Sequence, residues 1–227
     1  MGRVRLAPSI LTADFARLGE DIASVAATVD WFHLDVMDGH YVGNLTFGPA
    51  IVAAVRRSCD NPLHVHFMIS DPARYAGAFV NAGAQRISFH PEVTDDPDRV
   101  ISEIESHGAR AGVAIHPDVA IEVAEPFLER LAVVVVMTVR PGFGGQELLP
   151  GAVPKIRRAR EMIAGAGAAA DVEVDGGVNL RTLNEVVASG ADVVVAGSAI
   201  FDGVDPPAAA RRMRARLDAL TAGRRVP

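Results

Sequence analysis

The sequence predicts an α/β protein that folds as a single (β/α)8 (TIM) barrel. Short runs rich in β-branched residues alternate with longer helical patterns along the whole chain. About eight such units are present, and strands that alternate with helices in this way form parallel sheets. The chain has 227 residues, which suits one barrel over residues 1–227 and leaves no room for a second domain. An open, doubly wound sheet is the competing architecture.

The predicted strands are the β-branched runs, which are short and bounded by turn or helix signals. In chain order they are Val4–Ile10, Trp31–Val36, Leu63–Ile69, Gln85–His90, Ala111–His116, Val133–Thr138, Val172–Asp175 and Asp192–Ala196. The widest spacing follows the sixth run and contains the glycine-rich segment Pro141–Gln146. This segment is expected to form a mobile loop over the mouth of the barrel.

Helical patterns fill the intervals between these runs. They cover Phe15–Ala27, Ala50–Arg57, Ala73–Asn81, Arg99–Ser106, Val119–Leu131, Val153–Ala164, Leu180–Ser189 and Ala208–Leu220. Asp71-Pro72 and Asp205-Pro206 each place an N-cap residue before a first-turn proline, and Asn179 can cap the helix that follows it. Residues 223–227 are expected to be a frayed tail.

The composition argues against several classes of protein. The formal net charge is −6, so the chain lacks the basic character of a general nucleic-acid binder. No apolar run approaches the roughly 20 residues that cross a bilayer, and we expect no secretory signal. The lone cysteine, Cys59, fits a reducing compartment. We therefore expect a cytoplasmic protein without nucleic-acid or membrane partners.

Polar side chains gather at the carboxyl ends of the predicted strands, where the active site of such a barrel lies. They are Ser9, His33, Asp35, His64, His66, His90, His116, Asp175 and Ser198. His33 and Asp35 are two residues apart on one strand, so their side chains share a face. The same argument applies to His64 and His66.

Four of these residues make a candidate metal site. They come from three strands and offer two imidazoles and two carboxylates: His33, Asp35, His66 and Asp175. This donor set suits one divalent ion, Zn²⁺ or Fe²⁺ in the first place, with Mn²⁺ or Co²⁺ as alternatives. Any one histidine alone is better explained as a hydrogen-bonded interior residue. Four such residues at one end of the barrel favour a metal site.

Asp35 and Asp175 lie on the second and seventh predicted strands and are expected to face each other across the mouth. Opposed carboxylates can remove a proton from one face of a carbon and return a proton to the other face. A bound dication would keep both carboxylates ionised. The alternative is that both are ordinary ligands without a role in proton transfer.

Glycines follow the last three predicted strands, at Gly142, Gly144 and Gly145, at Gly176 and Gly177, and at Gly197 beside Ser198. Loops in this part of a barrel often bind phosphate through backbone amides, and glycine lets the backbone approach the anion closely. Each group alone is weak support, because turns also need glycine. The stretch that includes Phe143 does not complete a dinucleotide-binding pattern, because residue 147 is a glutamate.

Three methionines, Met37, Met68 and Met137, lie near the ends of the second, third and sixth predicted strands. Any one of them is explained by packing in the core or at the rim. Together they could form the soft wall of a water-poor pocket.

Several segments resemble the ribulose-phosphate 3-epimerase family, and they extend from the first predicted strand to the eighth. The two most specific are His33–His40, which reads HLDVMDGH, and Pro141–Gln146, which reads PGFGGQ. The others are Pro8–Leu11, Asp14-Phe15, Asn44–Thr46, His66–Met68, Glu173–Gly177 and Ala196–Phe201. The resemblance therefore covers essentially the whole chain.

The resemblance implies a barrel enzyme of the pentose phosphate pathway that interconverts D-ribulose 5-phosphate and D-xylulose 5-phosphate. It implies that the four candidate ligands bind the metal and that Asp35 and Asp175 are the acid and base. Ser9 and His66 would contact the ketose phosphate substrate. The loops at Gly142–Gly145, Asp175–Gly177 and Gly197-Ser198 would hold its phosphate. The family also implies a homo-oligomer, either a dimer or a hexamer.

Some positions depart from the usual pattern of the family. His64 replaces an acidic or apolar residue, Gly43 replaces a proline, and Arg140 replaces a small polar residue. The segments His90–Glu92 and Met137–Val139 look closer to the allulose-6-phosphate 3-epimerases. A ketopentose phosphate is the expected substrate, and D-allulose 6-phosphate is the alternative.

The expected reaction is epimerisation at C3 through a metal-stabilised enediolate, with one aspartate removing the C3 proton and the other reprotonating the opposite face. Barrel lyases that use a lysine are disfavoured, because the only lysine, Lys155, lies in the helix after the glycine-rich loop. A non-catalytic sugar-phosphate-binding barrel is the alternative from another class.

Overall fold

The strands of the computed structural model form a nearly closed parallel barrel. The structure describes residues 3–222, so the tail expected at 223–227 lies outside the described residues. The strands are β1 (Arg5–Ala7), β2 (Phe32–Met37), β3 (Leu63–Met68), β4 (Arg86–Phe89), β5 (Arg110–Ile115), β6 (Val133–Met137), β7 (Asp171–Asp175) and β8 (Val193–Val195). Their order in the 8-stranded sheet is β1-β8-β7-β6-β5-β4-β3-β2.

This strand order distinguishes the two predicted architectures. A doubly wound sheet places its first strand in the middle, whereas here β1 and β2 stand at the two ends of the order. A parallel bridge between Ser9 and His33 joins those ends. The predicted (β/α)8 barrel is therefore confirmed.

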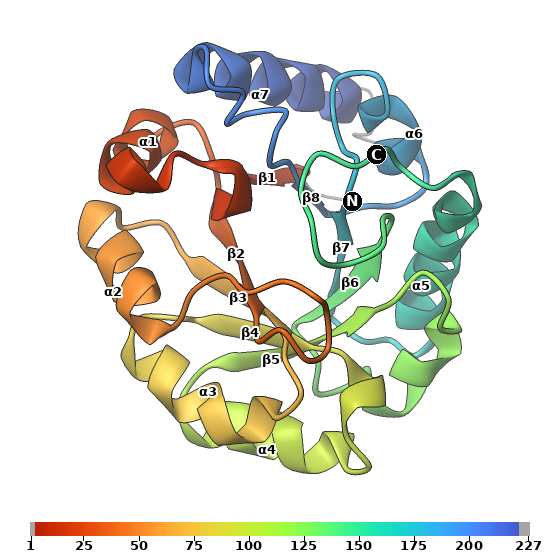
Figure 1. Cartoon of the computed structure of the whole chain (residues 1–227). Helices are drawn as coiled ribbons and strands as arrows, with labels where there is room; N and C mark the ends of the chain where they lie inside the picture. The colour runs from red at the N-terminus through yellow and green to blue at the C-terminus, as the bar shows by residue number, and fades with distance from the viewer. Residues whose placement is uncertain (1–2, 223–227) are drawn as a thin grey trace.

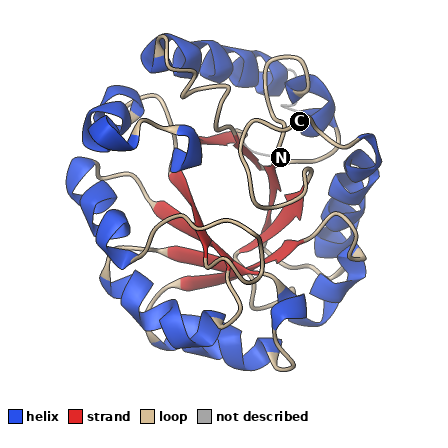
Figure 2. Cartoon of the chain, in the orientation of Figure 1, coloured by secondary structure: helices blue, strands red, loops and turns tan. Residues whose placement is uncertain are grey.

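Helices surround the strands on the outside of the barrel (Figures 1 and 2). They are α1 (Leu18–Val25), α2 (Pro49–Ser58), α3 (Pro72–Asn81), α4 (Pro97–Ser106), α5 (Val153–Gly165), α6 (Leu183–Ala188) and α7 (Pro206–Ala222). Asp71 accepts a hydrogen bond from the Arg74 backbone at 3.3 Å, and Asp205 accepts one from the Ala208 backbone at 2.9 Å. Both predicted Asp-Pro caps are confirmed.

The segment between β5 and β6 differs from the expectation. The pattern predicts an α-helix over Val119–Leu131, but the segment forms the 3-10 helix η4 (Ile121–Phe127). Pro126 lies inside η4 and has no N–H, so it cannot donate to the preceding turn as an α-helix requires.

Other predicted boundaries are wrong by a few residues. β1 ends at Ala7 because Ser9 caps the 3-10 helix η1 (Ile10–Thr12). The helix predicted over Phe15–Ala27 is divided into the 3-10 helix η2 (Phe15–Arg17) and α1.

The start of α6 is also later than predicted. Asn179 accepts a hydrogen bond from the Arg181 backbone at 2.9 Å, and the helix begins only at Leu183. Asn179 therefore stabilises the turn before α6 and does not cap the helix itself. Two further 3-10 helices, η3 (Pro91–Val93) and η5 (Pro150–Ala152), follow β4 and precede α5.

The two faces of each strand have different neighbours. On β2, Phe32, Leu34 and Val36 belong to the main apolar core between strands and helices. His33 and Asp35 alternate with them and point into the barrel. All residues of β2 are buried, as expected for a parallel strand that is covered on both faces.

The amino-terminal end of the barrel is closed by charged and aromatic side chains. Asp171 forms ion pairs with Arg5 and Arg86, the latter at 2.9 Å. The guanidinium groups of both arginines lie over the Trp31 ring, at 4.9 and 4.3 Å from its centroid. The charges at this end are therefore paired with one another and packed against an aromatic ring.

No helix within residues 3–222 combines the length and apolar character that crossing a bilayer requires. Cys59 is a free, half-buried cysteine at the end of α2.

Candidate active site

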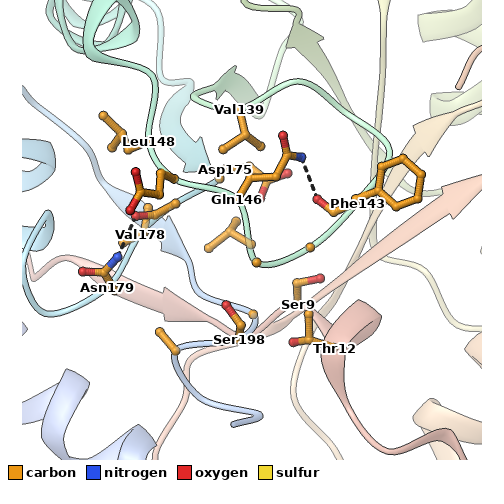
Figure 3. A pocket seen from close by; sticks show the side chains of 18 of the residues that line it. Ser9, Thr12, Val139, Phe143, Gln146, Leu148, Asp175, Val178, Asn179 and Ser198 are labelled. Atoms are coloured by element: carbon orange, nitrogen blue, oxygen red, sulfur yellow. Dashed lines mark hydrogen bonds between the residues drawn. The ribbon is translucent and has the colours of Figure 1, made fainter.

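A pocket of about 920 Å³ lies at the carboxyl ends of the strands. Its lining includes Ser9, Asp35, Met37, Met68, Met137, Gly142, Phe143, Gly144, Gly145, Asp175, Gly176, Gly177, Gly197 and Ser198. In Figure 3, Ser9, Thr12 and Ser198 lie across the pocket from the loop that carries Phe143 and Gln146. The structure therefore brings together most of the residues selected from the sequence.

The four candidate metal ligands converge on one point at the floor of this pocket. One ligand atom from each of His33, Asp35, His66 and Asp175 lies within 4.8 Å of the others. Nε2 of His33 is 3.3 Å from Asp35 Oδ1 and 3.6 Å from Asp175 Oδ2. Nδ1 of His66 is 3.2 and 3.6 Å from the same two oxygens. Two nitrogens and two oxygens at this spacing fit one divalent cation.

Strand register explains this convergence. In the β2–β3 ladder Asp35 pairs with His66, and both side chains point into the barrel. His33 lies two residues before Asp35 on the same face of β2. Asp175 is the last residue of β7, which is separated from β2 by β8 and β1. The carboxylates of Asp35 and Asp175 thus reach the same point from different sides of the barrel.

The electrostatics of this floor favour positive charge. Burial alone would lower the pKa of His33, but the carboxylates of Asp35, Asp175 and Glu173 raise it well above its ordinary value of 6.5. Burial alone would raise the pKa of Asp35, but His33 and His66 hold it well below its ordinary value. A group of carboxylates that stabilises protonated imidazole would also stabilise a bound cation.

Ser9 contacts one oxygen of Asp35. Its hydroxyl donates to Asp35 Oδ2 at 2.5 Å and accepts from the Leu11 backbone at 3.2 Å. Asp35 is only 4% exposed, so little water competes for this bond. Asp35 Oδ1 remains directed toward the two histidines.

Glu173 is a buried site residue that the sequence argument missed. It is 0% exposed on β7, and its Oε1 lies 2.8 Å from His33 Nδ1. Burial alone would raise the pKa of Glu173, but His64 and His33 hold it well below its ordinary value of 4.5. The available signal was strand alternation, because Glu173 stands two residues before Asp175 and must share its face.

His66, the second histidine of the candidate metal site, also has a partner on its other ring nitrogen. His66 Nε2 lies 3.0 Å from His90 Nε2, and the His90 ring packs against Tyr41 at 4.6 Å between centroids. Tyr41 in turn donates to Glu92 at 2.8 Å. Burial lowers the pKa of His90 to about 4, so His90 is neutral and can accept a hydrogen bond from His66 at neutral pH.

The glycine-rich loop is held in shape by its own hydrogen bonds and is joined to the segment after β2 by one further bond. Gln146 donates to the carbonyls of Arg140 and Phe143, at 2.7 and 2.8 Å. Asn44 donates to the carbonyl of Gly142 at 2.8 Å. Asn44 and Gln146 stand in segments that carry the family resemblance, but the sequence alone assigned them no role.

Two glycines of the candidate phosphate-binding loops lie so close to neighbouring atoms that a side chain would not fit without a shift. Gly177 has a φ of 66°, and an added Cβ would lie 2.3 Å from the Leu148 backbone nitrogen. An added Cβ on Gly144 would lie 2.6 Å from the Thr12 methyl. Larger residues at these positions would separate the loop from the pocket wall.

Other selected residues lie outside the pocket lining. His33 and His66 are 0% exposed, so of the four candidate ligands only Asp35 and Asp175 line the pocket itself. His116 is the residue after β5, and the ammonium group of Lys155 donates to its carbonyl at 3.0 Å. Lys155 is on α5 and makes two further bonds to the carbonyls of Pro117 and Val119, so it is held away from the pocket.

Comparison with known proteins identifies close relatives along nearly the whole chain. A family model described as the ribulose-phosphate 3 epimerase family matches residues 5–201. The ribulose-phosphate 3-epimerase of Serratia marcescens is 45% identical over 207 residues, which are 90% of this chain and 99% of that protein. The ribulose-phosphate 3-epimerase of Escherichia coli (strain K12) is 42% identical over 219 residues, which are 96% of this chain and 97% of that protein.

Solved structures with a similar fold are more distant in sequence. KGPDC from Streptococcus mutans superposes with a TM-score of 0.72 at 17% identity and covers 96% of this chain and 99% of its own. Orotidine 5'-phosphate decarboxylase from Pyrococcus horikoshii OT3 gives a TM-score of 0.69 at 14% identity and covers 93% of this chain and 98% of its own. At such identities the likeness concerns the barrel fold alone.

Proposed function

The chain belongs to the ribulose-phosphate 3-epimerase family, so it is an enzyme of pentose-phosphate epimerisation, and we propose that Asp35 and Asp175 carry the reaction beside one divalent metal ion. The proposed substrates are D-ribulose 5-phosphate and D-xylulose 5-phosphate, which differ in configuration at C3. The observation that carries the proposal is the convergence of these two carboxylates with two ring nitrogens on the pocket floor.

The donor set fits a divalent cation. Two imidazole nitrogens and two carboxylate oxygens suit Zn²⁺ or Fe²⁺, and also Mn²⁺ or Co²⁺. We propose that the ligands are His33, Asp35, His66 and Asp175. When bound, such an ion supplies positive charge that stabilises the negative charge developing on the oxygens next to C3.

The two aspartates divide the proton transfer between the faces of C3. One aspartate, in its ionised form, removes the C3 proton to give an enediolate. The other enters the step as a protonated carboxylic acid and donates its proton to the opposite face, so the two residues exchange protonation states in each turnover. Both residues line the pocket and reach it from different sides of the barrel. Ser9 keeps Asp35 in one orientation by donating to its Oδ2 atom.

The loops at the end of β6, β7 and β8 would hold the phosphate. Gly142–Gly145, Gly176-Gly177 and Gly197-Ser198 all line the pocket and can present backbone amides to an anion. When these loops hold the phosphate, the other end of the sugar reaches the pocket floor, and C3 is positioned between the two aspartates. The Asn44 contact would keep the loop closed, and the Gln146 contacts would keep its shape, so that water is excluded from the enediolate.

Met37, Met68 and Met137 are proposed to form the apolar wall beside the reacting carbons. All three line the pocket and are nearly buried. A thioether has no proton to donate, so these side chains can pack against the enediolate without quenching it.

The test is incorporation of solvent deuterium at C3. In D2O, each turnover of ribulose 5-phosphate should place deuterium at C3 of xylulose 5-phosphate. Binding without incorporation would indicate a sugar-phosphate sensor and would contradict the proposal.

Comparing kcat/KM for ribulose 5-phosphate and allulose 6-phosphate on the same preparation decides between the two substrates. The dimeric or hexameric state and the cytoplasmic location stay predictions from the sequence.

A further inference from the structure

We propose that Glu173 is a positioning residue that fixes the ring of the metal ligand His33, and that His64 and Ser88 in turn hold Glu173 in place. The inference rests on the proposed metal site and goes beyond it, because none of these three residues belongs to the four ligands. They lie one layer deeper in the barrel than the pocket floor.

The contacts form one continuous chain across the interior. Glu173 Oε1 is 2.8 Å from His33 Nδ1. The same carboxylate is 3.0 Å from His64 Nδ1 through Oε1 and 3.1 Å through Oε2. His64 Nε2 is 3.1 Å from the Ser88 hydroxyl. The four side chains come from β2, β3, β4 and β7, so the chain of contacts spans the barrel.

The whole network is sealed from solvent. His33, Glu173 and Ser88 are 0% exposed, and His64 is 1% exposed. A buried polar group that loses its hydrogen-bond partner destabilises the fold, and more so when the group is charged. Each member therefore depends on its neighbour for a hydrogen bond.

The direction of every hydrogen bond follows from the chemistry of the groups. An ionised carboxylate only accepts, so the Nδ1 atoms of His33 and His64 must both carry a proton. A metal-bound imidazole is neutral and has one ring proton. With that proton on Nδ1, Nε2 of His33 presents its lone pair toward Asp35 and Asp175. The metal needs this lone pair.

Glu173 thus selects between two tautomers of His33. Without it, the proton is drawn to Nε2, because two carboxylates face that atom at 3.3 and 3.6 Å. The proton would then occupy the position of the metal. Hydrogen-bonding partners of metal-ligating histidines act in this way in many metal sites, and their loss weakens metal binding by about 10- to 100-fold.

His64 explains how this chain keeps Glu173 in the correct orientation. By donating to the carboxylate, it prevents Glu173 from rotating away from His33. Ser88 completes the arrangement by donating to His64 Nε2, which fixes the tautomer of His64 as well.

The first test is titration with Co²⁺, followed by its visible absorption spectrum. The variant Glu173→Gln keeps the size of the side chain, but its NH2 group must face one of the two Nδ1–H donors. We expect its Kd for Co²⁺ to rise about 10- to 100-fold, with shifted absorption bands. Asp171→Asn is the matched control, since it alters a carboxylate on the same strand and face that ion-pairs with Arg86. The control should bind Co²⁺ like the wild type.

Each result of the titration has a distinct meaning. Equal Co²⁺ affinity and an unchanged spectrum in Glu173→Gln would overturn the positioning role while leaving the metal site intact. Absence of Co²⁺ binding by the wild type would overturn the metal site itself, and the positioning role with it. Weaker Co²⁺ binding by Glu173→Gln, together with wild-type Co²⁺ binding by Asp171→Asn, would support both the metal site and the positioning role.

A second measurement does not depend on how the variants fold. Histidine-ring NMR of the Zn²⁺-loaded wild type should find His33 protonated at Nδ1 and unprotonated at Nε2. A ring protonated at Nε2 would overturn the proposal.

A third test uses His64→Gln. This variant should raise the Kd for Co²⁺ less than Glu173→Gln does, because it removes only the support of Glu173. A larger effect for His64→Gln would contradict this order of contacts.

Discussion

The Ser9 hydroxyl donates to Asp35 Oδ2 at 2.5 Å, and this contact leaves Asp35 Oδ1 as the oxygen that faces His33 and His66. The two oxygens of one carboxylate therefore have separate environments. One is held by a hydroxyl at the start of η1, and the other is directed to the two histidines of the candidate metal site.

Ser9→Ala should lower kcat/KM by about 10- to 100-fold, because a hydrogen bond to a charged group contributes about 1.5–3 kcal/mol. Steady-state kinetics on ribulose 5-phosphate measures this change. Ser24→Ala serves as a control, since Ser24 is exposed and its hydroxyl donates to the Asp21 carbonyl within α1, away from the pocket. Wild-type kinetics in Ser9→Ala would show that the orientation of Asp35 does not depend on this contact.

Asp35→Asn and Asp175→Asn should each abolish epimerisation, because an amide can neither remove nor return the C3 proton. In D2O, each variant should still exchange the C3 proton of the one epimer that presents it to the remaining aspartate. The two variants should differ in which epimer they label, as detected by proton NMR. Net epimerisation within a few-fold of the wild type in either variant would contradict the two-base scheme.

Removal of metal by a chelator should silence the enzyme while the barrel remains folded. The fold should persist because the apolar core surrounds the strands independently of the four ligands. Activity after dialysis, circular dichroism and metal content would be measured on the same sample. Addition of Zn²⁺, Fe²⁺, Mn²⁺ or Co²⁺ should restore turnover. Full activity at undetectable metal content would exclude the Lewis-acid role.

Gly144→Ala should raise KM, because the new Cβ would lie 2.6 Å from the Thr12 methyl and would lift the loop from the pocket. Thr12→Ser removes that methyl, so the double variant Gly144→Ala with Thr12→Ser should recover a KM near that of Thr12→Ser alone. Gly151→Ala is the control, because nothing lies within 4 Å of an added Cβ there. A KM equally high in the double variant would indicate that steric contact is not the cause.

Asp38 should make stability depend on pH below 4. Burial alone would raise its pKa, but bonds from the Ser70 backbone and hydroxyl and from the His40 and Tyr41 backbones lower it from 3.8 to about 2. A carboxyl with a depressed pKa stabilises the fold above its ordinary pKa, and this contribution is lost as the pH falls toward 2. Urea unfolding should show the wild type more stable than Asp38→Asn at pH 5, with a smaller difference at pH 2.5. A difference that is constant over this range would contradict the assignment.

Much of the barrel could be predicted from local sequence. β-Branched runs and Asp-Pro caps are local signals, and strand alternation placed His33 beside Asp35 on one face without any tertiary information. The errors arose where a single residue overrides the pattern of its neighbours. Pro126 prevents an α-helix at η4, and the capping contact of Ser9 ends β1 at Ala7.

The sequence by itself determined the architecture, the four candidate ligands and the glycine loops, because each depends on periodicity or on residue type. The tertiary structure alone decided which side chains meet in the interior. Glu173 reaches His33 and His64 only because strand register and barrel closure bring β7 opposite β2 and β3 at one level. Such contacts join residues more than 100 positions apart, as His64 and Glu173 are, and no local pattern encodes that distance.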